Sequence, residues 1–194
     1  MKTPANNQNK PIMVLDTSAF LAGYDPFSRS EEQVTVPKVR EEIRKNSLKW
    51  MRFEIAIEAG KLKVKAPQEK FFNKAKTSAT NVGDSYLLSE TDTQLLALAL
   101  ELRTEGYTPQ ILTDDYSIQN VATQLGIEFS ALATFGIKRL LVWNRYCPAC
   151  HRQYPINCSF NECQICGTQL KRKPCRTTKN SPLHPPNQRR HDAT

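Results

Sequence analysis

The sequence predicts an α/β domain in which helices flank a central parallel sheet, followed by a small cysteine-rich module. Up to about residue 138, short apolar runs typical of strands alternate with stretches of helical periodicity, an order typical of parallel sheets. All six cysteines of the 194 residues lie after that region. We therefore expect a disordered tail over residues 1–10, the α/β domain over 11–138, the cysteine module over 139–173 and a basic disordered tail over 174–194.

The first strand is the segment Ile12–Leu15, four apolar residues that end at Asp16. A continuous apolar run bounded by polar residues is typical of a fully buried parallel strand. Asp16 is then placed at the carboxyl end of the strand, where open α/β sheets bind ligands. Thr17 or Ser18 is expected to cap the helix that follows, although Asp16 itself is an alternative helix cap.

The remaining elements follow from apolar spacing and from turn residues. Pro37 suits the first turn of a helix, and Asn46 or Ser47 can cap the next one, which Gly60 closes. Ser89 and Asp92 have the spacing of a capping box before a largely apolar helix. Further strands are expected at 33–36, 62–66, 109–113, 127–129 and 140–143, and further helices at 67–82 and 116–125.

The positive charge is concentrated near the C-terminus. Residues 144–194 hold 9 of the 27 Lys and Arg but only 2 of the 19 Asp and Glu, so they account for +7 of the net charge of +8. Such a segment is suited to neutralising phosphates, while a solvated tail is the simpler alternative. The sequence has no apolar run near the roughly 20 residues of a membrane span and no signal peptide, so we expect a soluble, cytoplasmic protein.

Four acids occupy equivalent positions at strand ends and on helices. Because right-handed crossovers bring the ends of successive strands to one edge of a sheet, we expect these acids to converge there. Clustered carboxylates repel one another unless a cation is bound, and Mg²⁺ and Mn²⁺ prefer such oxygen ligands. Taken singly, each acid also has a structural explanation as a helix cap or surface charge. The four are Asp16, Glu42, Asp92 and Asp115.

These segments together resemble a PIN-domain ribonuclease over about residues 11–130. The matching motifs are Val14-Leu15-Asp16-Thr17-Ser18, Pro37-x-Val39-x-x-Glu42-Ile43, Ser89-x-x-Asp92 and Leu112-Thr113-Asp114-Asp115. Residues 113–122 and the cysteine module are similar to the Nob (NIN-one-binding protein) endonucleases of archaea. That resemblance implies a single-strand-specific endoribonuclease, dependent on Mg²⁺ or Mn²⁺, that trims the 3′ end of precursor small-subunit rRNA on the pre-ribosomal particle.

The resemblance assigns catalytic and metal-binding roles to Asp16, Glu42, Asp92 and Asp115. Asp114 remains the alternative to Asp115, since successive residues leaving a strand point to opposite sides and only one is expected to face the metal. Glu42 is preferred over its neighbour Glu41 because the family's acid precedes an aliphatic residue. The hydroxyls of Thr17 and Thr113 are suited to orienting these acids.

The cysteine module has zinc-ribbon spacing. Two CxxC pairs, separated by twelve residues, allow four thiolates to surround one structural Zn²⁺ without leaving an open position for catalysis. So small a module depends on the metal for its folding. Cys158 is the main alternative ligand, and the role of Cys175 stays open. The expected ligands are Cys147, Cys150, Cys163 and Cys166.

Basic side chains surround the two cysteine pairs, with aromatic residues between them. This combination suits an RNA-docking surface, although the aromatic rings can equally form the core of the ribbon itself. The expected RNA-binding residues are Arg145, Arg152, Lys171, Arg172 and Lys173.

Two other functions fit parts of the sequence. A toxin-type PIN ribonuclease acting on tRNA or mRNA would share the fold, but such proteins usually lack a zinc ribbon. A non-catalytic, RNA-binding ribosome assembly factor would keep the ribbon, but it gains nothing from clustered acids beside RNA phosphates. We therefore expect the rRNA endonuclease, with an RNA-binding assembly factor as a further partner.

Overall fold

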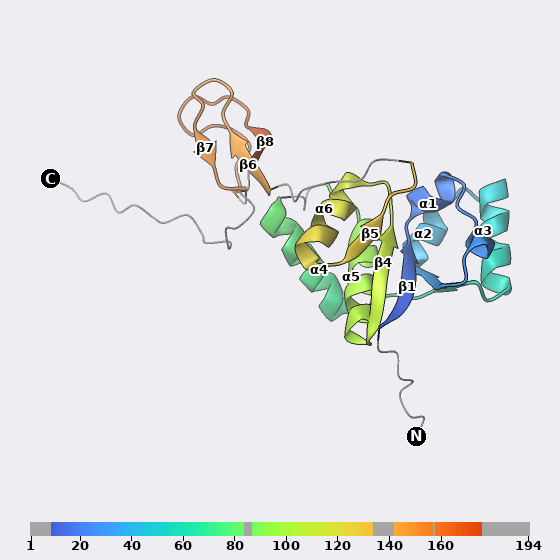
Figure 1. Cartoon of the computed structure of the whole chain (residues 1–194). Coiled ribbons are helices and arrows are strands. Elements are labelled where there is room, and N and C mark those ends of the chain that lie inside the picture. Colours follow the sequence, from blue (N-terminus) through green and yellow to red (C-terminus); the bar gives the residue numbers. More distant parts are fainter. Residues whose placement is uncertain (1–8, 84–86, 134–141, 157, 176–194) are drawn as a thin grey trace.

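The computed structural model describes residues 9–83, 87–133, 142–156 and 158–175. A five-stranded parallel sheet and a three-stranded antiparallel sheet lie in separate parts of the molecule (Figure 1). The first sheet has the strand order β3-β2-β1-β4-β5, and the second has the order β7-β6-β8. The predicted combination of a parallel α/β sheet with a small C-terminal module is confirmed.

The strands of the parallel sheet lie close to the expected segments. The buried residues of β1 and the end of β4 are apolar, as expected of strands covered by helices, whereas β2 buries Gln33 and Thr35 beside Val34. The strands are β1 (Lys10–Leu15), β2 (Glu32–Thr35), β3 (Leu62–Val64), β4 (Tyr107–Leu112) and β5 (Glu128–Ser130).

Helices cover both faces of this sheet (Figure 1). The helix α5 packs against β1 and β4, and α4 and α6 pack against α5. The short helix η1 (Pro26–Ser28) precedes β2. The α-helices are α1 (Thr17–Leu21), α2 (Pro37–Glu42), α3 (Leu48–Glu58), α4 (Glu69–Val82), α5 (Glu90–Thr104) and α6 (Tyr116–Leu125). In the described ranges, no helix combines the length and the apolar character that a membrane span requires.

Most of the predicted helix ends are confirmed, and one is wrong. Ser47 caps α3, and Ser89 forms the expected capping box with Asp92 at the start of α5. The N-cap of α1 is Asp16, whereas Thr17 and Ser18 already lie inside the helix. The Asp16 carboxylate accepts from the first helical N–H, so no hydroxyl is needed there.

The second sheet consists of β6 (Val142–Tyr146), β7 (Gln153–Tyr154) and β8 (Lys171–Cys175). Its strand β6 leads directly into the first cysteine pair, as expected, while residues 140 and 141 of the predicted strand lie outside the described residues. The strand β8 extends to Cys175, beyond the expected end of the module at residue 173, and β1 starts at Lys10, the last residue of the expected tail. The remainder of both expected tails, 1–8 and 176–194, lies outside the described residues.

The ribbon contacts the first domain at the end of α4. Gly83, the C-cap of α4, has a left-handed backbone with φ of 78°. A Cβ atom added there would lie 1.7 Å from Ile156 Cδ1 and 3.4 Å from Trp143 Cβ. A side chain at this position would therefore require Ile156 to move, and glycine also fits the left-handed conformation without strain.

We expect Gly83→Ala to separate the ribbon from α4. The variant carries a backbone cost of about 1 kcal/mol for the left-handed conformation and, in addition, a clash with Ile156. In a Trp50→Phe background, the emission of Trp143 should shift to the red as its ring becomes more exposed.

Gly60→Ala is the matched control, because Gly60 has a similar φ of 69° and no atom within 4 Å of an added Cβ. This control should lose the same amount of stability from the left-handed backbone and leave the emission of Trp143 unchanged. Identical spectra for the two variants would show that the contact at Gly83 does not hold the ribbon.

Candidate active site and zinc ribbon

Asp16 lies at the carboxyl end of β1, the central strand of the parallel sheet. The strands β2 and β4 pair with β1 on its two opposite sides, so the strand order reverses direction at β1. Open parallel sheets bind ligands at the carboxyl ends of the strands at such a point. The carboxylate is buried and accepts hydrogen bonds from Thr17 N (2.6 Å), Ser18 Oγ (2.6 Å) and Thr113 Oγ1 (2.8 Å). Burial raises the pKa of Asp16, and these donors oppose that rise. The carboxylate is thus fixed in orientation by its donors.

Asp115 stands beside it, at the end of β4. The hydroxyl of Thr113 accepts a hydrogen bond from Asp115 N (3.0 Å) while it donates to Asp16, so one side chain links the two acids. The Asp115 carboxylate also caps α6 by accepting from Ser117 N at 2.6 Å. The predicted role in the site and a structural role as a cap are therefore compatible.

Asp114 has a different environment. Its carboxylate oxygens accept hydrogen bonds from the backbone N–H groups of Leu132 and Ala133, with the shortest N···O distances at 3.0 Å. These contacts tie the segment after β5 to the end of β4. The carboxylates of Asp114 and Asp115 therefore hold different segments of the chain.

Glu42 reaches the same edge from the end of α2. Thr17 Oγ1 donates to Glu42 Oε2 at 2.5 Å, and the backbone N–H of Thr17 donates to Asp16, so Thr17 connects these two acids. The adjacent Glu41 is exposed and forms an ion pair with Lys38 at 3.3 Å. The preference for Glu42 over Glu41 therefore agrees with the geometry.

Asp92 approaches from the first turn of α5, where its carboxylate accepts from Ser89 N at 2.7 Å. Burial raises the pKa of Asp92, and the negative charges of Asp115 and Asp16 raise it further. A nearby negative charge disfavours the ionised form of a carboxylate. Asp92 is thus both a capping residue and a member of the acidic cluster.

The four acids leave negative charge without a protein cation. None of them forms an ion pair with Lys or Arg in the part of the chain that the structure describes. They also do not form a compact group of ligand atoms like that of the cysteines, which is the one group of that kind among the described residues. Oxygen donors set somewhat apart suit Mg²⁺ or Mn²⁺, which keep several waters when bound. Such an ion would activate an attacking water and stabilise the leaving oxygen in phosphodiester hydrolysis.

The cysteine cluster fits Zn²⁺. The sulfur atoms of Cys147, Cys150, Cys163 and Cys166 all lie within 4.8 Å of one another, with Cys147–Cys166 at 3.4 Å and Cys150–Cys163 at 3.5 Å. A tetrahedron with Zn–S bonds of about 2.3 Å places its sulfurs about 3.8 Å apart. The four predicted ligands therefore match a closed structural zinc site.

Tyr154 supports this cluster in a way that the sequence did not suggest. Its hydroxyl lies 3.0 Å from Cys163 Sγ and lowers the pKa of that thiol to about 6. Its ring packs edge-on against Phe160, with 5.3 Å between centroids. A tyrosine beside a CxxC pair has no distinctive spacing, so only the folded geometry identifies this role.

Cys158 stands apart from the four ligands. Its sulfur accepts from Arg145 Nη1 at 3.5 Å and is not part of the cluster. Arg145 also donates to the carbonyl of Phe160 (2.7 Å) and to Asn161 Oδ1 (2.8 Å), so this arginine holds the loop between the two cysteine pairs. The side chain of Cys175 is outside the described set.

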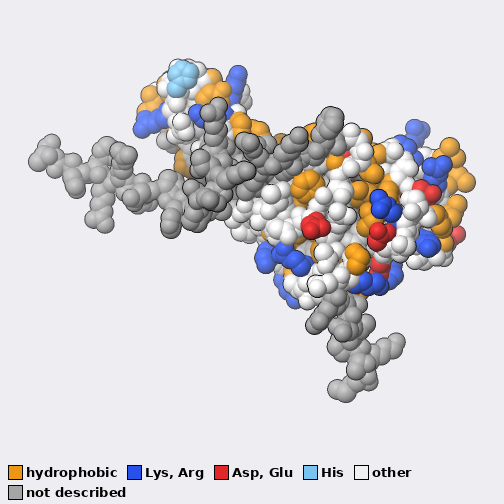
Figure 2. Space-filling model, in the orientation of Figure 1, with side chains coloured by type: hydrophobic (Ala, Val, Ile, Leu, Met, Phe, Trp, Pro, Cys, Tyr) orange, Lys and Arg blue, Asp and Glu red, His pale blue; other side chains and the backbone are white. Residues whose placement is uncertain are grey.

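The other basic residues of the ribbon lie on or near its two paired strands. Arg172 stacks over Trp143 with 4.6 Å between the guanidinium carbon and the ring centroid, and Lys173 Nζ lies 5.2 Å from the ring centroid of Tyr146. Arg152 and Lys171 are exposed. Lys and Arg side chains thus lie at the ribbon surface (Figure 2), in contrast to Arg145, which is engaged within it.

We call the edge of the sheet at Asp16, Glu42, Asp92 and Asp115 the acidic edge. Sequence reasoning missed one further residue there. Ser18 Oγ donates to Asp16 and accepts from Asp114 N at 3.1 Å, so it joins the ends of β1 and β4. The sequence feature that could have identified Ser18 is its position two residues after Asp16. Sequence reasoning assigned Ser18 only a capping role.

Comparisons with known proteins agree with this geometry. A family model described as the PIN domain of ribonuclease matches residues 13–102. Endoribonuclease Nob1 of Methanothermobacter thermautotrophicus is 40% identical over 82% of this chain and 91% of its own length. Endoribonuclease Nob1 of Methanocaldococcus jannaschii is 38% identical over 84% of this chain and 77% of its own. A protein named ribonuclease VapC1, from Thermoplasma acidophilum, is 33% identical over 83% of the chain and 77% of its own length.

The strongest of these similarities extends over nearly the whole of a relative, and the described cysteine cluster completes the expected arrangement of a PIN domain with a zinc ribbon. The chain therefore belongs to the Nob1 family of endoribonucleases.

Proposed function

We propose that this chain is a metal-dependent endoribonuclease that cuts single-stranded precursor rRNA of the small ribosomal subunit at its 3′ end. The observation that supports this most is the set of four acids at the switch point of the sheet, none of which pairs with a Lys or Arg of the described residues. The family relation supports the same chemistry, since similar proteins are named endoribonucleases.

The acids have distinct parts in this proposal. Asp16, Glu42, Asp92 and Asp115 would hold Mg²⁺ or Mn²⁺ next to the phosphate that is cut. The hydroxyls of Thr17 and Thr113 fix the carboxylate positions through the hydrogen bonds described above. Since clustered negative charges repel RNA phosphates, a bound cation would bring the phosphate to this edge, while the ribbon would supply most of the affinity for RNA.

The ribbon would position the enzyme on its substrate. Its four thiolates serve a structural Zn²⁺, and the exposed Arg152 and Lys171 with the stacked Arg172 and Lys173 offer contacts to phosphates and bases. In this proposal the RNA is presented on a pre-ribosomal particle, with an RNA-binding assembly factor as the expected protein partner.

A ribonuclease of the toxin type is the second candidate, because ribonuclease VapC1 is 33% identical over most of the chain. The two candidates share the chemistry and differ in the RNA that is cut. Competition between a single-stranded RNA spanning the mature 3′ end of small-subunit rRNA, a tRNA and an unrelated mRNA would separate them. We expect preferential cutting of the first in Mn²⁺ or Mg²⁺, whereas preferential cutting of tRNA or mRNA would favour the toxin type.

The neighbouring acids Asp114 and Asp115 provide a specific prediction. Asp115→Asn should reduce the cleavage rate by more than about 100-fold, because it removes a charge that faces the metal. Asp114→Asn should reduce it far less and instead lower the melting temperature, since the Asp114 carboxylate anchors the segment at Leu132 and Ala133. Single-turnover cleavage and thermal denaturation of both variants check this, and the reverse ranking of the two rates would exchange the roles.

A further inference from the structure

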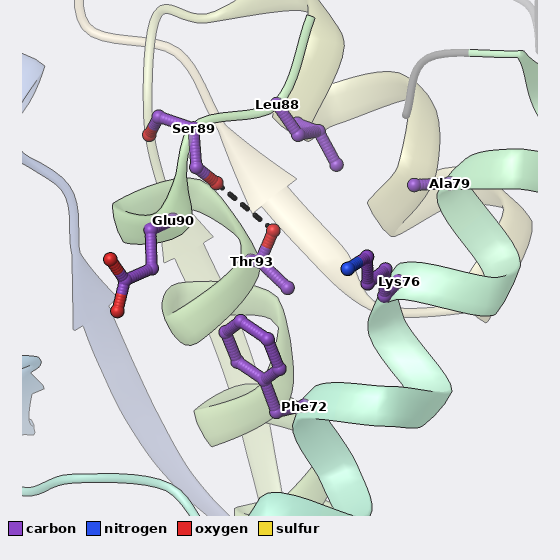
Figure 3. Close-up of a pocket in the computed structure, with 7 residues that line it drawn as sticks. All are labelled: Phe72, Lys76, Ala79, Leu88, Ser89, Glu90 and Thr93. Carbon is purple, nitrogen blue, oxygen red and sulfur yellow. Dashed lines mark hydrogen bonds between the residues drawn. The ribbon is translucent and has the colours of Figure 1, made fainter. Parts of the chain in front are cut away.

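A groove lies directly beside the acidic edge, between α4 and the start of α5 (Figure 3). Its volume is about 330 Å³, within the range of small-molecule sites. It shares the first turn of α5 with the acidic edge, because Ser89 lines the groove and donates its backbone N–H to Asp92. The lining residues are Phe72, Lys76, Ala79, Leu88, Ser89, Glu90 and Thr93.

The lining of the groove is mixed, and Phe72, Leu88 and Ala79 supply its apolar part, which includes an aromatic ring. Phe72 extends from α4 toward α5, and Leu88 reaches in from the segment before α5 (Figure 3). Ala79 and Thr93 are buried at the base, where the Thr93 hydroxyl donates to the Ser89 carbonyl at 2.9 Å. Because that hydroxyl is already satisfied within the protein, the inner part of the groove favours a flat, largely apolar group.

The mouth of the groove carries a positive charge. In the described ranges, no carboxylate lies within ion-pair distance of Lys76 Nζ. Glu90 also lines the groove, but its side chain points away from Lys76 in Figure 3. Glu90 pairs with Lys38 at 3.7 Å and accepts from Gln94 Nε2 at 3.3 Å. Among the described residues, Lys76 is thus a lysine of the groove without an ion-pair partner, and it lies near the first turn of α5, which carries Asp92.

We infer that this groove is a subsite for one unpaired nucleotide of the RNA, next to the nucleotide whose phosphate is cut. The base lies against the Phe72 ring and Leu88, and Lys76 contacts a phosphate of the same strand. The inference rests on the proposed function, because a strand whose phosphate reaches Asp92 must pass the first turn of α5, which the groove shares. A base within a duplex is stacked and paired and cannot enter the groove, so this subsite favours single strands.

Two variants of the full-length protein test the subsite, each in an Asp16→Asn background that allows binding to be measured without cleavage. The probe is a fluorescein-labelled single-stranded RNA of the rRNA 3′ boundary, in Mg²⁺. Phe72→Leu retains the apolar packing and removes the ring, so affinity should fall about 5- to 100-fold. Lys76→Ala should lower the slope of log K against log salt by about 0.7, the value for one phosphate contact on a single strand.

Lys74→Ala is the matched control. Lys74 is exposed on the same helix but does not line the groove, so this variant should retain both the affinity and the salt slope. Lys76 is also exposed, so its removal should leave folding intact, and equal melting temperatures would verify this. Equal salt slopes for Lys76→Ala and Lys74→Ala, with unchanged affinity for Phe72→Leu, would refute the subsite.

Failure of the subsite can be distinguished from failure of the proposed function. If only the subsite is wrong, the active enzyme still cuts in Mn²⁺, and both groove variants cut at the same rate and position. If the proposed function is wrong, even the chain with an intact groove makes no metal-dependent cut. Photocrosslinking of 4-thiouridine RNA to Asp16→Asn provides an independent readout. A crosslink to α4 peptides that contain Phe72 supports the subsite, whereas crosslinks confined to other segments contradict it.

Discussion

Asp16→Asn should reduce RNA cleavage by more than about 100-fold while leaving RNA binding nearly unchanged. Removal of a group that only supports a metal ligand typically lowers metal affinity or activity 10- to 100-fold. Loss of the charge of a ligand itself should therefore lower the cleavage rate further. Asp16 is the best choice because it lies at the end of the central strand and is buried with three hydrogen-bond donors around it. Cleavage and filter binding of the same labelled RNA, measured side by side, check both halves of the prediction.

The folding of this variant should be preserved. The amide oxygen of Asn can accept from Thr17 N, and its NH₂ group can donate to the hydroxyls of Ser18 and Thr113. Burial raises the pKa of Asp16, so in the metal-free protein the ionised carboxylate opposes folding once the pH exceeds the unfolded-state pKa of about 3.9. In EDTA at pH 7, the melting temperature of Asp16→Asn should therefore be no lower than that of the parent chain. Any increase in melting temperature should vanish as the pH falls below about 4. A large drop in melting temperature at pH 7 would instead assign Asp16 a structural role.

Cys163→Ser should abolish zinc binding and unfold the ribbon without unfolding the α/β domain. Structural zinc sites contribute an apparent binding free energy of about 10–16 kcal/mol, far more than the core of so small a module can replace. The buried residues of the ribbon are few, namely Cys147, Tyr154 and Cys163, whereas the α/β domain has its own extensive core. Zinc release measured with a chromophoric chelator should fall from one ion per chain to none.

Cys158→Ser is the control for this prediction. Its sulfur lies outside the cluster of four and contacts Arg145 instead, so the variant should still bind one zinc ion. Far-UV circular dichroism of Cys163→Ser should retain the helical signal, because the described helices all precede the ribbon. Loss of zinc from Cys158→Ser, or loss of the helical signal from Cys163→Ser, would contradict the account.

Much of the fold could be predicted because local signals agree with the tertiary structure. The apolar run before Asp16, the capping box of Ser89 with Asp92 and the two CxxC pairs each depend on residues close in sequence. Of the caps expected for α1, Thr17 and Ser18 were wrong and the alternative, Asp16, was correct, because an acid that ends a strand can also accept from the first turn of the next helix. The sequence suggested Asp16 either as a site residue at the end of β1 or as a helix cap, and in the structure it ends the strand and also caps α1.

Other features depend on contacts between distant segments and could not be predicted. The different surroundings of Asp114 and Asp115 depend on the segment at Leu132 and Ala133, which the sequence does not relate to the end of β4. Similarly, the bonds that Arg145 donates to groups around Phe160 within the ribbon depend on the folded loop between the two cysteine pairs. The groove beside Asp92 required the packing of α4 on α5, to which Phe72 and Leu88 contribute from separate segments.

The most direct test of the central claim is to map the ends produced from an RNA that spans the mature 3′ end of small-subunit rRNA. The reaction is run with the parent chain in Mn²⁺, in Mg²⁺ and in EDTA, and with Asp16→Asn in Mn²⁺. We expect one cut at the mature end that requires a metal ion and disappears in the variant. A cut that persists in EDTA or in Asp16→Asn would contradict this expectation, because the four carboxylates would then not be the site of catalysis.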